Sequence, residues 1–209
     1  MDIKTKILET ASEKYLSYGI RNITMDALAL DLGVSKRTIY EHFSDKENLV
    51  IEVFAHLFLK QNQINFEIVE QAENAIEAIF YIMARQKENM ENLTPIFIED
   101  MKRYIPKVNR IYFGNDEFIK QHSASYHLLE KGLKEKVFRN ELRIDLIDVF
   151  IQELHLFIFD NDRIKLQQPS EEEIRDNIFM PYLRGLCTPK GMKLIEHYFE
   201  KSHDSKTNE

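Results

Sequence analysis

Side chains that could donate hydrogen bonds to phosphates and base edges are gathered in one short stretch near the N-terminus. Basic, hydroxyl, phenol and imidazole side chains are the usual donors in such contacts. On an isolated basic helix they are most often a solvated surface, so their interpretation depends on the elements that hold them. The candidates are Thr24, Ser35, Lys36, Arg37, Thr38, Tyr40, His42 and Lys46.

Two short helices joined at a glycine would hold these side chains. Thr24 is a good N-cap for the first helix, which ends at Gly33, and Ser35 caps the second. The first helix repeats apolar residues at intervals of three and four, which predicts one buried face. The second turns Ile39 and Phe43 inward and its polar residues outward. The buried face of the first helix comprises Met25, Leu28, Ala29 and Leu32.

The spacing of three small or apolar residues predicts a helix-turn-helix. Ala29 is small where the two helices cross, Gly33 can adopt the positive φ of the turn, and Ile39 fills the space between the helices. In a helix-turn-helix, the second helix enters the major groove of DNA. The outward residues of this helix are therefore placed to read DNA.

The same periodicity predicts an all-α fold of about nine or ten helices without a sheet. A first helix spans Ile3 to Tyr18 and stops at Gly19. A fourth starts with a capping box between Ser44 and Glu47 and continues past Phe58. Further helices are expected at about residues 73–91, 95–105, 116–138, 144–160, 171–186 and 189–201.

The prolines mark most of the predicted helix boundaries. Pro95, Pro106, Pro169 and Pro189 lie at or near expected ends. Pro181 falls inside a predicted helix and should kink or split it.

Three segments together resemble the DNA-binding signature of the tetracycline-repressor-like (TetR) family of regulators: Thr24–Ala29, Gly33–Phe43 and Ser44–Leu49. The resemblance covers about residues 5–50. Leu32 departs from it, because the family often has alanine before the glycine. The resemblance implies that Tyr40, His42, Lys46 and Thr24 contact phosphates, and that Ser35, Lys36, Arg37 and Thr38 face the groove. Arg37 is the best candidate for a guanine contact.

The resemblance also implies two segments with different roles. Residues 1–47 would form the DNA-binding domain and residues 48–203 a helical effector-binding and dimerisation domain. Residues 204–209 hold no apolar side chain and are predicted to form a disordered tail. The segment Ile144–Phe159 is apolar nearly all round, so something must cover it. A second subunit is the implied cover and the chain's own helices are the alternative. The predicted interface residues are Phe150, Leu154, Phe157, Ile158, Phe179, Leu183 and Leu186.

An apolar effector pocket is the second implied feature. The helices from about residue 54 to 130 are rich in aromatic residues and methionine, which suits such a cavity and equally suits an ordinary core. The predicted effector is a small molecule of unknown identity, and the aromatic and methionine side chains favour an apolar one. The predicted pocket residues are Phe80, Met83, Phe97, Met101, Tyr104, Phe118, His122 and Tyr126.

Composition and motifs weigh against other function classes. The 209 residues carry a net charge of −7, and residues 1–50 hold seven basic against eight acidic residues, so DNA affinity must come from local placement. The sequence contains no Gly-rich phosphate loop, no zinc-protease motif and only one cysteine, Cys187. We therefore expect no enzyme, no cofactor, no metal and no membrane segment, and a cytoplasmic location.

The expected function is a sequence-specific, DNA-binding transcriptional regulator, with double-stranded operator DNA, a small-molecule effector and a second copy of the chain as its partners. The family's commoner mode makes it a ligand-released repressor that binds a pseudo-palindromic operator as a homodimer. The alternative is a regulator-derived helical module that works through protein partners rather than DNA.

Overall fold

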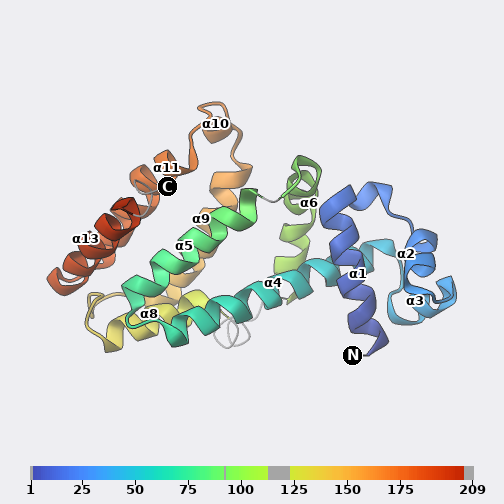
Figure 1. The fold of residues 1–209 in the computed structure, drawn as a ribbon, viewed down its shortest axis with the longest axis horizontal. Coiled ribbons are helices and arrows are strands. Elements are labelled where there is room, and N and C mark those ends of the chain that lie inside the picture. Colours follow the sequence, from blue (N-terminus) through green and yellow to red (C-terminus); the bar gives the residue numbers. More distant parts are fainter. Residues whose placement is uncertain (1, 92, 113–122, 205–209) are drawn as a thin grey trace. The chain divides into compact units, whose positions relative to one another are not determined.

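A computed structural model describes residues 2–91, 93–112 and 123–204 of the chain (Figure 1). These residues form helices, and the described part contains an isolated antiparallel bridge between Phe138 and Cys187 but no longer strand. The prediction of an all-α fold is confirmed. The chain divides into two compact units, one of residues 1–62 and 89–122 and one of residues 63–88 and 123–209.

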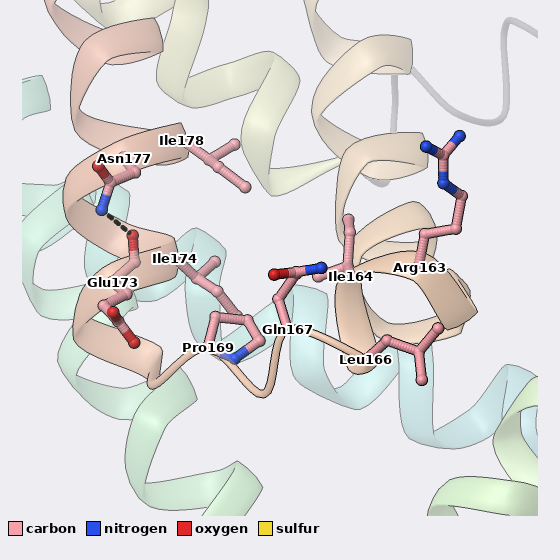
Figure 2. Close-up of a pocket in the computed structure, with 9 residues that line it drawn as sticks. All are labelled: Arg163, Ile164, Leu166, Gln167, Pro169, Glu173, Ile174, Asn177 and Ile178. Atoms are coloured by element: carbon pink, nitrogen blue, oxygen red, sulfur yellow. Dashed lines mark hydrogen bonds between the residues drawn. The ribbon is translucent and has the colours of Figure 1, made fainter.

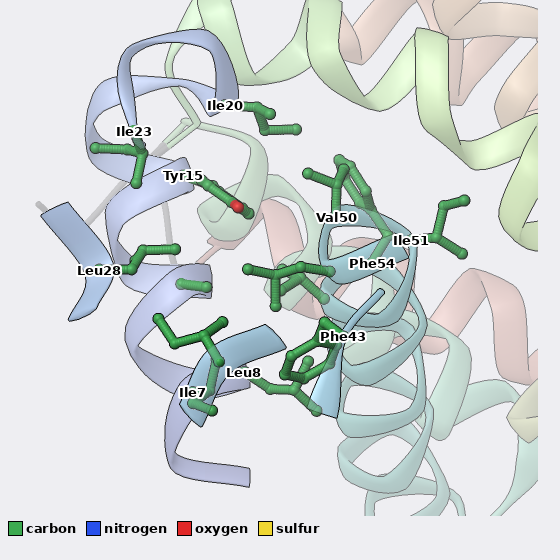
Figure 3. Close-up of a cluster of buried hydrophobic side chains, with 14 of the residues drawn as sticks. Ile7, Leu8, Tyr15, Ile20, Ile23, Leu28, Phe43, Val50, Ile51 and Phe54 are labelled. Carbon is green, nitrogen blue, oxygen red and sulfur yellow. The ribbon is translucent and has the colours of Figure 1, made fainter. Parts of the chain in front are cut away.

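The first unit contains five helical segments and the N-terminal part of a long helix. They are α1 (Ile3–Tyr18), the 3₁₀ turn η1 (Ile20–Asn22), α2 (Met25–Leu32), α3 (Lys36–His42), the N-terminal part of α4 (Lys46–Gln71) and α6 (Pro95–Tyr112). Their apolar faces meet in one core. Figure 3 shows part of it, with Ile7, Leu8 and Tyr15 of α1 on one side and Val50 and Phe54 of α4 on the other.

Helix α6 belongs to the same unit because it packs on α1. Thr94 donates a hydrogen bond from Oγ1 to the carbonyl of Leu16 at 3.2 Å. Gly19 has a φ of 76° and lies so close to the side chain of Ile96 that a Cβ would clash with it. This compact unit therefore extends beyond the predicted boundary at residue 47, while the predicted division by function stays a prediction.

The second unit combines the end of α4 with later helices. They are α5 (Ala75–Glu91, in its first part), α8 (Ala124–Lys134), α9 (Ile144–Asp160), α10 (Asp162–Lys165), α11 (Glu171–Ile174), the π-helical segment η2 (Arg175–Phe179), α12 (Met180–Leu186) and α13 (Pro189–Asp204). Their core includes Ile76, Leu129, Phe138, Met180 and Ile195.

Two charged side chains at the C-terminal end of α8 hold the turn between α4 and α5. The ammonium of Lys131 donates to the carbonyls of Val69 and Ala72, both at 2.7 Å, at the end of α4. The carboxylate of Glu135, just after α8, accepts from the backbone N–H of Ala75 at 2.8 Å, at the start of α5. Each charge thus opposes the partial charge of the helix end that it contacts.

A buried carboxylate joins the start of α8 to α9. Asp148 accepts hydrogen bonds from Ser123 Oγ at 2.8 Å and from Gln152 Nε2 at 3.0 Å. Ser123 also caps α8, because its Oγ accepts from the backbone N–H of Tyr126 at 3.2 Å. Asp148 is almost fully buried, and these donors replace the water that it loses.

Several predicted helix boundaries are wrong. The expected helix 95–105 continues through Pro106, which is exposed, to Tyr112. The expected helix 116–138 is described from Ala124 and ends at Lys134, because Lys136 adopts a φ of 60° and the chain then pairs with the segment around Cys187. The predicted disruption near Pro181 is confirmed as the π-helical segment just before it.

The predicted capping box of the fourth helix is also wrong. Helix α4 begins at Lys46, and the side chain that accepts from its first turn is Asp45, whose Oδ1 receives the N–H of Asn48 at 2.8 Å. Glu47 pairs with Lys107. The predicted disordered tail falls largely outside the described residues, since α13 reaches Asp204.

Candidate nucleic-acid interface

The turn between α2 and α3 has the geometry that the sequence predicts. Gly33 adopts φ 65° and ψ 31°, the left-handed conformation that glycine tolerates best. The backbone N–H of Val34 then donates to the carbonyl of Ala29 at 3.0 Å. Ala29 and Ile39 are buried between the helices, as expected, and the departure at Leu32 leaves the left-handed turn intact because Leu32 is buried in the same core.

Both helices of the motif start at the predicted caps. Thr24 Oγ1 accepts from the backbone N–H of Ala27 at 3.1 Å. Ser35 Oγ accepts from the backbone N–H of Thr38 at 3.0 Å and lies 2.9 Å from Thr38 Oγ1. A threonine hydroxyl that accepts in this way keeps its own hydrogen for another acceptor, such as a phosphate oxygen.

Helix α3 separates its buried and exposed residues as predicted. Ile39 and Phe43 are buried in the core of the first unit. The residues that the sequence predicts to contact DNA from this helix lie on its outer side. Of these, Lys36, Arg37, Tyr40 and His42 are exposed and Thr38 is half-buried.

Two of the exposed cations are paired with carboxylates of the same motif. Lys36 Nζ lies 2.8 Å from Asp26 Oδ2 in the first turn of α2, and this hydrogen bond raises the pKa of Lys36. Arg37 Nε lies 3.1 Å from Glu41 Oε1, four residues further along α3. Neither acidic partner is among the residues predicted from sequence, although the spacing of Arg37 and Glu41 is the usual one for a helical ion pair.

Lys46 occupies a different position from the other predicted contacts. Its ammonium donates to the carbonyl of Ile20 at 2.7 Å and is partly buried, which lowers its pKa. The backbone N–H of the same Ile20 donates to Asp100 Oδ2 of α6 at 2.8 Å. Lys46 therefore secures the turn between α1 and α2. Asp100 lies far from Ile20 in sequence, and no local pattern predicts their contact.

The structure divides the predicted effector residues between the two units. Phe97 is buried in the core of the first unit, where Met101 and Tyr104 pack against it. Phe97 and Tyr104 each stack on Phe54, with ring centroids 5.5 and 6.0 Å away. The remaining described members, Phe80, Met83 and Tyr126, belong to the second unit, and Phe118 and His122 lie outside the described residues.

A surface pocket of about 610 Å³ lies in the second unit between α10 and the α11–η2 segment (Figure 2). Ile164 and Ile178 lie on opposite sides of it, and the loop with Pro169 closes one end. None of the predicted effector residues that the structure describes is among those that line it. The lining residues are Arg163, Ile164, Leu166, Gln167, Pro169, Glu173, Ile174, Asn177 and Ile178.

The predicted interface residues fall into two groups. Phe150 and Phe157 of α9 are 47% and 54% exposed, and Leu146 and Val149 extend the same apolar surface. Leu154 and Phe179 are half-buried, and the side chain of Ile158 is outside the description.

Leu183 and Leu186 are instead buried in the core of the second unit, 8% and 7% exposed, so they have little surface left for a partner subunit. Within the part of the chain that is described, no helix combines the length and apolarity needed to cross a membrane.

Comparison with known proteins identifies the N-terminal region. Residues 7–53 match the family model described as "Bacterial regulatory proteins, tetR family". The chain is 24% identical over 154 residues to the HTH-type transcriptional repressor KstR2 of Mycobacterium tuberculosis, covering 71% of this chain and 75% of that protein. It is 31% identical over 121 residues to the uncharacterized HTH-type transcriptional regulator YvaF of Bacillus subtilis, covering 57% and 62%. Neither name describes an enzyme.

Solved structures share the fold over most of the chain. A TetR-family transcriptional regulator from Pectobacterium atrosepticum superposes with a TM-score of 0.62 at 18% identity, covering 88% of this chain and 94% of that one. The reduced form of NemR from E. coli gives a TM-score of 0.56 at 15% identity, covering 90% and 98%. The architecture of both is therefore that of this chain.

Proposed function

Because this chain belongs to the TetR family of DNA-binding transcriptional regulators, we propose that it is a repressor that acts as a homodimer on a pseudo-palindromic operator and is released by a small-molecule effector. The observation that carries the proposal is the outer face of α3, where donors project from a helix-turn-helix whose glycine has the required left-handed conformation. A cytoplasmic location follows from the DNA partner.

The proposed contacts follow the chemistry of each side chain. Tyr40, His42 and the hydroxyl of Thr24 would donate to phosphate oxygens, which fixes the register of the protein on DNA. Ser35, Lys36, Arg37 and Thr38 would face the major groove, with the fork of the Arg37 guanidinium on guanine O6 and N7. Thr38 is half-buried, and the other residues of this set are exposed.

Lys46 would reach a phosphate only by giving up its bond to Ile20 or by sharing its protons between the two acceptors. An ammonium has three donors, so sharing is chemically possible. We propose that Lys46 makes its phosphate contact in this shared mode, with its position fixed by the carbonyl of Ile20.

Dimerisation would serve both the protein and the operator. Phe150 and Phe157 are large apolar side chains that remain about half exposed, and a second copy would remove their surface from water. A two-fold dimer also presents two copies of α3 to two half-sites, which doubles the number of contacts.

Release by an effector would be a shift between two states of the dimer. A ligand that binds better to a dimer whose α3 helices do not match the half-site spacing draws the population away from DNA. The many aromatic and methionine residues between about residues 54 and 130 favour an apolar ligand. The residues that contact it stay a prediction.

The test is fluorescence anisotropy of the full chain on duplexes selected from a random library and on DNA from upstream of its own coding region. We expect tight binding with two chains per duplex and a slope of log K against log salt shallower than about −10, because residues 1–50 carry almost balanced charge. Tyr40→Ala should weaken binding to all sequences.

The matched control is Tyr81→Ala, which removes an exposed tyrosine of the second unit and should bind as the wild type does. Failure of the selection to enrich any sequence would contradict the proposal and favour a module that works through protein partners. A slope steeper than about −10 would contradict the expectation that the balanced charge of residues 1–50 limits the number of phosphates neutralised.

A further inference from the structure

The ion pair between Arg37 and Glu41 places a carboxylate on the face of α3 that is proposed to approach DNA. The Arg37 and Glu41 side chains are 88% and 58% exposed, so their attraction is screened by water and adds little to stability. A carboxylate at this position would also repel the phosphates of any duplex that α3 approaches. The charge of Glu41 therefore lowers affinity for DNA of any sequence, and only a gain in sequence discrimination through its contact with Arg37 would offset this cost.

The atoms joined by the contact indicate what that gain is. Glu41 Oε1 accepts from Arg37 Nε, 3.1 Å away, which is the nitrogen at the base of the guanidinium. The two terminal nitrogens form the outer edge of the fork, and that edge can donate in parallel to guanine O6 and N7. A bond at Nε thus fixes the plane of the guanidinium while its reading edge stays available.

Arginine benefits from such a contact more than lysine does. An exposed arginine side chain loses much rotamer freedom when it is fixed on a base, and a contact that fixes it beforehand reduces this loss. Lys36 shows the contrast, because its ammonium is a point charge and its partner Asp26 lies on the other helix of the motif. Of the two ion pairs, only Arg37–Glu41 fixes the plane of a donor group, and both of its residues lie on α3.

We propose that Glu41 is a positioning residue that pre-orients the Arg37 guanidinium for end-on recognition of a guanine in each half-site. The inference rests on the proposed function and extends it, because it assigns sequence discrimination to a pair of residues rather than to Arg37 alone. Glu41 itself makes no contact with DNA in this arrangement. Its contribution is to specificity, and its charge lowers affinity for all sequences alike.

The experiment uses the full chain and a duplex selected from the random library, with each guanine replaced in turn by 7-deazaguanine. This base lacks the N7 acceptor and keeps normal pairing. For the wild type, one symmetric pair of guanines should show a loss of about tenfold in affinity or more, the size expected for a bidentate arginine contact. Arg37→Ala should abolish this loss.

Two substitutions of Glu41 separate hydrogen bonding from charge. Glu41→Gln keeps an acceptor oxygen within reach of Nε and removes the charge, whereas Glu41→Ala removes both. Both variants should bind random-sequence duplexes more tightly than the wild type, because each removes one negative charge. The 7-deazaguanine loss should stay above about fivefold in Glu41→Gln and fall below about threefold in Glu41→Ala. Alanine is a strong helix former, so α3 should persist.

The control variant is Glu13→Gln, which removes the same charge from an exposed site on α1 and should keep the wild-type loss on 7-deazaguanine. The positioning role would be overturned if Glu41→Ala lost as much affinity on 7-deazaguanine substitution as the wild type does, or if the alanine and glutamine variants lost equal amounts. If Arg37→Ala lost as much affinity on this substitution as the wild type does, another residue would read the guanine, which also overturns the proposal.

The proposed function has its own separate failure. A library that yields no preferred duplex would remove both the proposed function and this inference. A preferred duplex with an unaltered 7-deazaguanine profile in Glu41→Ala would leave the regulator intact and remove the inference alone.

Discussion

The phenol of Tyr15 lies in the core of the first unit without a hydrogen-bond partner among the described residues (Figure 3). The side chain is fully buried, and burial raises the pKa of its hydroxyl. An unsatisfied buried hydroxyl costs free energy that a phenylalanine would not. The ring itself provides the packing, and the oxygen is the unfavourable part.

We expect Tyr15→Phe to leave the free energy of unfolding unchanged or to raise it by up to about 1 kcal/mol, measured by urea denaturation. Tyr198→Phe is the matched control, because its hydroxyl accepts from Asn74 Nδ2 at 3.0 Å, and it should lose about 1 kcal/mol. A clear destabilisation of the Tyr15 variant would mean that its hydroxyl has a partner.

Gly33 is the residue at which backbone conformation matters most for α3. A Cβ there would meet no atom within 4 Å, so the cost of a side chain is conformational and not steric. We expect Gly33→Ala to destabilise the protein by about 1 to 2 kcal/mol in thermal or urea unfolding and to weaken DNA binding.

Gly185 provides the comparison, because it lies within α12 in a helical conformation with open space around it. Gly185→Ala should stabilise the protein by about 0.5 to 1 kcal/mol. Equal effects at the two glycines would contradict the importance of the left-handed conformation at Gly33.

At the scale of elements, the contact of Lys131 with the end of α4 should be worth more than an ordinary surface lysine. Its ammonium satisfies two carbonyls that have no partner within their own helix. We expect Lys131→Met to lower the free energy of unfolding by about 1.5 to 3 kcal/mol, measured in urea. Lys134→Met removes an exposed lysine from the same helix and should change it by less than about 0.5 kcal/mol.

The elements that sequence predicts well are those whose signals are local. The turn at Gly33 and the caps Thr24 and Ser35 depend on residues within a few positions of each other, so the helix-turn-helix follows from spacing. The capping box at Ser44 failed because Asp45 beside it is an equally good acceptor, and only the structure decides between them.

Boundaries and contacts set by distant partners could not be predicted. Helix α8 ends at Lys134 because the following chain bonds to the end of α12, with Arg139 N–H donating to the Leu186 carbonyl at 3.0 Å. Leu183 and Leu186, predicted from sequence to lie in the interface, have the same apolar character as Phe150, and only packing shows that they belong to the core. Apolar periodicity predicts that one face of a helix is buried, but it does not tell whether the same chain or a second subunit buries it.

At the scale of the whole molecule, the exposed apolar face of α9 should decide the oligomeric state. We expect Phe150→Glu combined with Phe157→Glu to convert a dimer into a monomer in analytical ultracentrifugation, because charged side chains oppose burial between two copies. Operator affinity should fall by at least about tenfold, since only one α3 then remains per molecule.

Tyr81→Glu places the same charge on another exposed aromatic residue of the second unit and should leave the dimer intact. A double variant that sediments like the wild type would mean that α9 is covered by something other than a second copy. A monomeric wild type would contradict the dimer directly.

The turn around Ile20 offers a built-in probe of motion in the first unit. Its backbone N–H is held by Asp100 of α6 and its carbonyl by Lys46 of α4, so a three-residue turn is anchored on two long helices. An amide in so short a turn normally exchanges its hydrogen with deuterated solvent quickly, whereas this one should exchange slowly. Any ligand that draws α6 away from the turn would release this single amide, and its exchange rate would report the transition without a label.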